Sequence, residues 1–169
     1  MPDRDVIDQV LGAWTLNNRI GLKLLQAIPA GGLGVVPAGS KARNVAQVFA
    51  HMHHVRFAWL RHFAPSSMSG MARFRRGAVP MRSELKCALG ASGKAVERFL
   101  RRAFNGELKI KCFKRQPIRR TAYLISHEPH HRGQIALALR QTGMRLPQEI
   151  AIRTMWQDWY WGRSNYGRE

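Results

Sequence analysis

Apolar residues recur every three or four positions along most of the chain, which is the spacing of amphipathic α-helices. The first such segment covers residues 6–28 and ends at the stretch PAGGLG, which is rich in helix-breaking residues. The others cover residues 44–63, 81–104 and 119–142, and Gly143 is expected to stop the last of them. The pattern predicts four long helices.

Each predicted helix has a face that is expected to point into the protein. The third helix is expected to be capped near Ser83. On the second helix the inward face carries Val48, His51, Val55, Ala58 and Trp59. On the fourth helix it carries Tyr123, Leu124, His127, His131, Gln134, Ile135 and Ala138. Four amphipathic helices in a chain of 169 residues predict one all-α domain over residues 1–169, built as a four-helix bundle.

The segments between the predicted helices are long. Residues 64–80 are rich in proline, serine, glycine and arginine, and residues 105–118 form a basic connection. The tail contains Trp156, Trp159 and Trp161 and is expected to add a short helix over one end of the bundle.

The net charge is the unusual feature of the composition. Lysine and arginine total 28 against 10 acidic residues, a formal charge of +18, which favours anionic partners such as nucleic acid. The basic residues are densest at residues 73–76 and 109–120, but neither segment carries a recognisable nucleic-acid-reading module. Binding of nucleic acid through the basic surface therefore stays open beside a plain solvated surface.

The sequence favours a cytoplasmic protein. No apolar run approaches the ~20 residues that a membrane-spanning helix needs. The first residues, MPDRDVIDQV, include acids and lack the apolar core of a secretion signal. Cys87 and Cys112 have no CxxC spacing and are expected to be free thiols.

The seven histidines fall in two windows, residues 51–62 and 127–131. His127 and His131 are four residues apart and so share one face of a helix, as a chelating pair should. His51 lies on the expected inward face of the second helix. Three neutral imidazoles from two helices form a site for zinc, nickel or ferrous iron with coordination positions left open. The alternative is a set of core histidines bonded to the backbone or to one another.

The other polar residues near these histidines have smaller expected roles. Gln134 and Tyr123 share the face of His127 and His131 and are candidates for hydrogen bonds that orient the imidazoles. The remaining histidines are expected on the surface or the flanks of their helices: His53, His54, His62 and His130.

Residues 127–131 also spell HExxH, the spacing of zinc peptidases, in which the glutamate activates a metal-bound water. Pro129 lies between the two histidines, where a proline removes a helical hydrogen bond and kinks the helix. Glu128 is rotated by ~100° from His127 and is expected to lie on a flank. A peptidase is therefore the less favoured interpretation.

Two segments resemble a known family. VAQVFAHMHHVRFAWL (45–60) followed by SHEPHHRGQIALALRQTGMRLP (126–147) closely resembles the DinB-like (DinB/YfiT-like) superfamily, and AWTLNNRIGLKLL (13–25) fits its first helix more loosely. The resemblance implies a four-helix bundle of up-down-down-up connectivity, often dimeric. It also implies a divalent metal held by His51, His127 and His131. This sequence departs from the pattern at Pro129.

The resemblance implies a metal-dependent enzyme in which the ion activates a low-molecular-weight thiol for transfer or isomerisation, or a bound water for hydrolysis. The reaction itself is not specified by the sequence. A basic vestibule would suit a small anionic or thiol substrate. The alternatives are a structural or vestigial metal site, and a non-catalytic basic bundle that binds nucleic acid or another anionic surface.

Overall fold

The computed structural model describes residues 3–108 and 112–161. Four long helices dominate it: α1 (Arg4–Ala27), α2 (Val45–Phe63), α3 (Arg82–Phe104) and α4 (Pro117–Gln141). Short helical turns connect them, namely η1 (Gly32–Gly34), η2 (Pro65–Met68) and η3 (Phe113–Arg115). After α4 come the π-helix η4 (Glu149–Gln157) and α5 (Asp158–Tyr160). Across residues 3–108 and 112–161 there is no strand, so the predicted all-α fold is confirmed.

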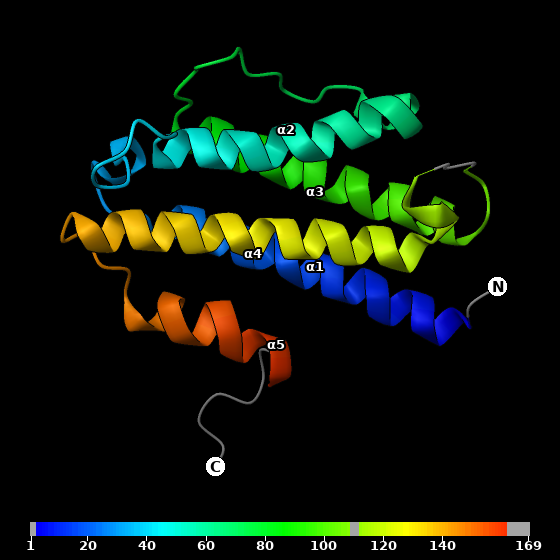
Figure 1. Cartoon of the computed structure of the whole chain (residues 1–169). Helices are drawn as coiled ribbons and strands as arrows, with labels where there is room; N and C mark the ends of the chain where they lie inside the picture. The colour runs from blue at the N-terminus through cyan, green and yellow to red at the C-terminus, as the bar shows by residue number, and fades with distance from the viewer. Residues whose placement is uncertain (1–2, 109–111, 162–169) are drawn as a thin grey trace.

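The helices form an up-down-down-up bundle. Figure 1 shows α1 and α4 running in one direction and α2 and α3 in the other. Both α1 and α2 pack against α3 and α4, which places α1 and α2 at opposite corners of the bundle. The connection from α2 to α3 must therefore return along the whole bundle, which explains why residues 64–81 form a long segment.

Local hydrogen bonds set the helix ends close to the predicted ones. Asn44 caps α2, because its side chain accepts from the Gln47 N–H while the Gln47 side chain accepts from the Asn44 N–H. Gly143 has φ 76° and ends α4. The cap predicted near Ser83 is wrong, because α3 begins one residue earlier and the Glu84 carboxylate accepts from the Met81 N–H.

The inward face of α2 lies about one position away from the predicted one. The fully buried large side chains of α2 are Phe49, Met52, Arg56 and Leu60. His51, Val55 and Trp59 lie on the half-buried flank, and Ala58 is exposed. Both sets of residues have helical spacing, so the spacing alone does not choose between the two faces.

The closest approach in the core joins α1 to α3. Nε1 of Trp14 donates to the backbone carbonyl of Gly93 at 3.0 Å. A Cβ atom at position 93 would overlap the side-chain amide of Asn18. Gly93 therefore lies inside a helix because no larger residue fits between α3 and α1.

The tail helix is present but lies along α1, which corrects the expectation that it covers an end of the bundle. Asp158 is buried and attaches the tail, with Oδ2 at 3.2 Å from Nζ of Lys23 and 3.8 Å from Nη2 of Arg19. Trp156 and Trp161 are exposed. The tail is held to the bundle by charge as well as by apolar contacts.

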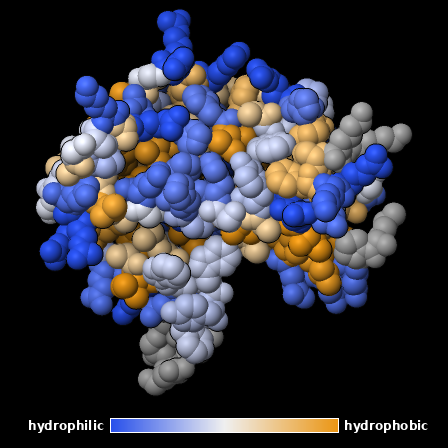
Figure 2. Space-filling view, in the orientation of Figure 1, coloured by the Kyte–Doolittle hydropathy of each residue, from blue (hydrophilic) through white to orange (hydrophobic). Residues whose placement is uncertain are grey.

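The surface is strongly polar. Figure 2 shows hydrophilic side chains over most of the visible face, interrupted by small apolar patches. Within the described residues, none of the helices combines the length and the apolar composition that a bilayer-spanning segment requires.

Substitution of the two glycines of α3 should have opposite effects. Gly93→Ala should lower the free energy of unfolding by about 1–3 kcal/mol, because the new methyl group displaces Asn18 from its bond to buried Arg56. Gly90→Ala meets no atom within 4 Å and should raise it by about 0.5–1 kcal/mol. Urea denaturation measures both, and equal effects would contradict the close approach of α1 and α3.

Candidate metal centre

Three imidazoles converge between α2 and α4. His51 extends from α2, and His127 and His131 extend from successive turns of α4. The ring centroid of His51 lies 5.4 Å from that of His127 and 4.7 Å from that of His131. The centroids of His127 and His131 are 4.5 Å apart. One nitrogen from each ring lies within 4.8 Å of the others, so the group could hold one metal ion. The structure thus brings together the residues that the sequence selected.

Pro129 does not interrupt α4. The helix is continuous from Pro117 to Gln141, with Pro129 inside it and exposed to solvent. The two histidine rings lie one turn apart on the same side of α4, with Nε2 to Nε2 at 3.0 Å.

Hydrogen bonds fix the orientation of His131. Its Nδ1–H donates to Oε1 of Gln134 at 2.8 Å, which leaves Nε2 with a lone pair directed at His127. The Gln134 amide also donates to Nε2 of His130 at 3.1 Å. The predicted role of Gln134 in orienting His131 is therefore supported by a direct hydrogen bond. Tyr123 instead stacks on the His127 ring, with the ring centroids 6.1 Å apart and the ring planes 30° from parallel.

The site favours neutral imidazoles. Burial, with the nearby charges of His131 and Arg43, lowers the pKa of His51 to about 4. Burial also lowers the pKa of His127 and of His131. Metal ions bind the neutral form of imidazole, so these side chains need not lose a proton before they bind an ion at neutral pH.

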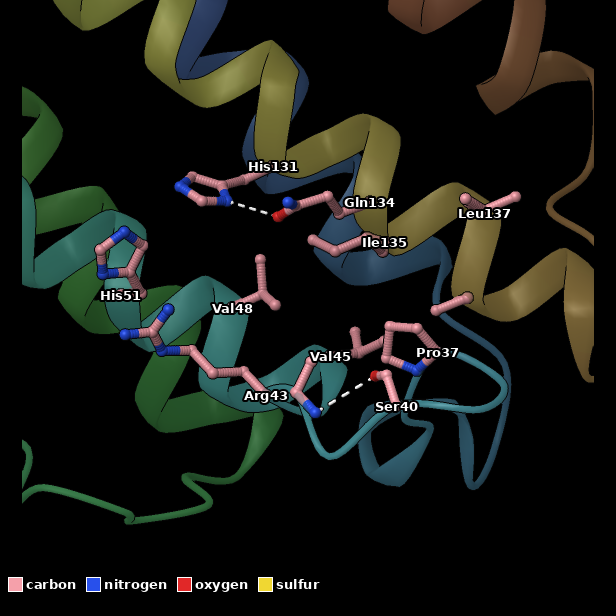
Figure 3. Close-up of a pocket in the computed structure, with 12 residues that line it drawn as sticks. Pro37, Ser40, Arg43, Val45, Val48, His51, His131, Gln134, Ile135 and Leu137 are labelled. Carbon is pink, nitrogen blue, oxygen red and sulfur yellow. Dashed lines mark hydrogen bonds between the residues drawn. The ribbon is translucent and has the colours of Figure 1, made fainter.

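A cavity of about 320 Å³ opens beside two of the imidazoles. Figure 3 shows His51 and His131 facing one end of it and apolar side chains of α2 and α4, with Pro37 of the preceding loop, along the rest. A ligand in this cavity would lie next to any ion held by the histidines.

Glu128 is buried, and the expectation of a flank carboxylate is wrong. It is 1% exposed, its Oε1 accepts from Nε of Arg56 at 2.6 Å, and its Oε2 accepts from Nδ2 of Asn17 at 2.6 Å. Arg132 is also buried and donates to Oδ1 of Asn17 at 2.9 Å. Glu128 is thus the anion between two buried guanidinium groups.

This network removes the basis for a zinc-peptidase interpretation of HExxH. In such enzymes the glutamate must reach a water on the metal. Here both carboxylate oxygens of Glu128 are bonded to Arg56 and Asn17 in the core. The imidazoles of His127 and His131 face a different side of α4, because successive helical residues are rotated by ~100°.

The other histidines divide between core and surface. His53 was expected on the surface or a flank but is fully buried, and its Nε2–H donates to the Ala72 carbonyl at 2.8 Å. Burial lowers its pKa. His54 is half-buried, and His62 and His130 are exposed, as expected. His53 is a core histidine bonded to the backbone.

The buried network was not predicted from the sequence, although the sequence contains a signal for it. Arg56 follows Phe49 and Met52 and precedes Leu60 at helical spacing, so an arginine lies within an apolar stripe. Asn17 likewise lies on the inward stripe of α1. Polar residues at two such positions on different helices indicate a buried polar contact.

One comparison with known proteins supports the predicted family resemblance. A family model described as the DinB family matches residues 121–163, a segment that contains His127 and His131. The predicted DinB-like resemblance is confirmed. The match does not extend to α2, so the inclusion of His51 rests on geometry. No curated protein and no solved structure matches the chain.

Loss of the buried anion should destabilise the fold. Glu128→Gln leaves Arg56 and Arg132 without a counter-charge, and the free energy of unfolding should fall by about 3 kcal/mol. Glu149→Gln removes an exposed partner of Arg153 and should change it by at most about 0.5 kcal/mol. Chemical denaturation of both variants measures the difference, and similar values would show that the buried ion pair contributes little.

The stability of the metal-free protein should fall as the pH is lowered from about 6.5 toward 4. In the unfolded chain His51 binds its proton near pH 6.5, but in the folded protein only near pH 4, so acidification favours the unfolded state. The measurement is denaturation with a chelator present, from pH 6.5 to 5. His51→Gln should lose less stability over this window than the original protein, and parallel curves would contradict the lowered pKa.

Proposed function

We propose that the chain is a metal-dependent DinB-like protein that holds one divalent ion through His51, His127 and His131. The convergence of the three imidazoles supports this proposal. Three neutral nitrogen ligands suit zinc or nickel, and ferrous iron as well, and they leave coordination positions for a water or a substrate atom. Such an open site is typical of catalytic metal centres.

A bound divalent ion would lower the pKa of a coordinated water or thiol and polarise a reacting group. The protein's own side chains would orient the imidazoles and shield them from solvent. The Gln134 carboxamide fixes the Nδ1–H of His131, so that Nε2 faces the site. Tyr123 covers one face of the His127 ring. The family resemblance suggests a low-molecular-weight thiol as the cofactor, and a homodimer remains a prediction.

The net charge of +18 supports a second candidate, a non-catalytic bundle that binds nucleic acid or another anionic surface. This function does not need the imidazoles. It predicts binding that weakens steeply with salt and that is unaffected by loss of His131. The metal site and the basic surface can therefore be tested independently.

Metal analysis of purified protein, after reconstitution with zinc or nickel, tests the proposal. The protein should bind one equivalent, and His51→Ala, His127→Ala and His131→Ala should each lose it because each removes one of three ligands. His62→Ala is the matched control, since His62 is an exposed histidine on the same helix as His51. Retention of metal by the site variants, or no binding by the original protein, would overturn the three-histidine site.

A further inference from the structure

The cavity beside the imidazoles has two chemically different ends. Figure 3 places His51, His131 and Arg43 together at one end. The walls away from them are aliphatic and are formed by Val45 and Val48 of α2 and by α4 residues such as Ile135. A volume of about 320 Å³ is at the small end of the range for ligand sites. The shape and lining suit a small molecule with one polar end.

Arg43 supplies positive charge at the polar end. It lies in the segment just before α2, is exposed, and extends its guanidinium toward His51 in Figure 3. Its charge is close enough to contribute to the lowered pKa of both His51 and His131. Among the described residues that line the cavity, none is acidic. The electrostatic field at this end therefore favours an anion.

Two other polar residues of the lining, Ser40 and Gln134, already make hydrogen bonds. The Ser40 hydroxyl accepts from the Ala42 N–H, and the Gln134 amide bonds to His131 and His130. No hydrogen bond or ion pair of Arg43 occurs within residues 3–108 and 112–161. Apart from the imidazoles proposed as metal ligands, the guanidinium is the polar side chain at this end with no hydrogen-bond partner among residues 3–108 and 112–161. Its planar fork matches the two oxygens of a carboxylate.

We propose that the cavity binds a small carboxylic acid with an aliphatic body, whose carboxylate pairs with Arg43 and whose body lies against Val45, Val48 and Ile135. This deepens the proposed function, because it places the substrate class beside the metal ligands. The recognition itself uses only Arg43 and the apolar walls. Sugars and polyphosphates fit less well, since the aliphatic walls offer them few donors.

The test is titration of the zinc-loaded protein with hexanoate and with hexanamide, its uncharged analogue, followed by backbone amide NMR shifts. Hexanoate should shift the amides of Val48 and Ile135 and bind at least about fivefold more tightly than hexanamide. Arg43→Gln should remove this preference. Lys41→Gln is the matched control, because Lys41 is an exposed cation two residues away that does not line the cavity.

The outcomes separate this inference from the metal site. Equal affinity for hexanoate and hexanamide, or equal effects of Arg43→Gln and Lys41→Gln, would overturn the carboxylate site even if zinc binds. Hexanoate binding that requires zinc but not Arg43 would also overturn it, since the ion alone would then hold the carboxylate. Protein that takes up no zinc but binds hexanoate through Arg43 would support the cavity and reject the metal site.

Discussion

The ion pair between Arg56 of α2 and Glu128 of α4 is the interaction on which the rest of the structure depends. Both side chains are at most 2% exposed, and Nε to Oε1 is 2.6 Å. The Nη1 group of Arg56 also donates to Asn18 of α1 and to the Leu89 carbonyl of α3. One guanidinium therefore contacts all four long helices, and the same group lies over the Trp14 ring at 5.0 Å.

This ion pair also sets the register of the imidazoles. His51 precedes Arg56 by five residues on α2, and His127 is adjacent to Glu128 on α4. If α2 slid along α4 by one turn, Arg56 would lose its anion and His51 would move away from His127 and His131. A buried charge without a partner costs several kcal/mol, so the alternative registers are strongly disfavoured. Stability and site geometry thus depend on the same contact.

Hydrogen bonds link the charged groups of the buried network through Asn17. Glu128 is one carboxylate between two guanidinium groups, and Asn17 bridges it to Arg132 by donating to one and accepting from the other. Burial lowers the pKa of Arg132 to about 10, which still leaves it charged at neutral pH. The nearby histidines stay neutral mainly because burial lowers their pKa values, while the charge of Glu128 acts in the opposite direction on His127 and His131.

The positions of the helices can be predicted from the sequence, but the face that each helix turns toward the core cannot. Helical spacing and the stop at Gly143 locate four helices within a few residues, and the i,i+4 spacing of His127 and His131 identifies a shared face. The inward face of α2 could not be chosen, because burial of Arg56 depends on an anion 72 residues away. The position of the tail depends likewise on Asp158 meeting Lys23, a contact that no local pattern contains.

The segment His127-Glu128-Pro129 shows that successive residues of one sequence motif can lie in different environments. At ~100° per residue, three successive side chains of a helix point to three environments. His127 faces the cleft between α2 and α4, Glu128 faces the core, and Pro129 faces solvent. The proline lies on the exposed side of an uninterrupted α4, and the glutamate is unavailable to a metal-bound water because it is bonded to Arg56. The same letters that spell a peptidase motif therefore place a pair of histidines beside His51 and a glutamate in a buried ion pair.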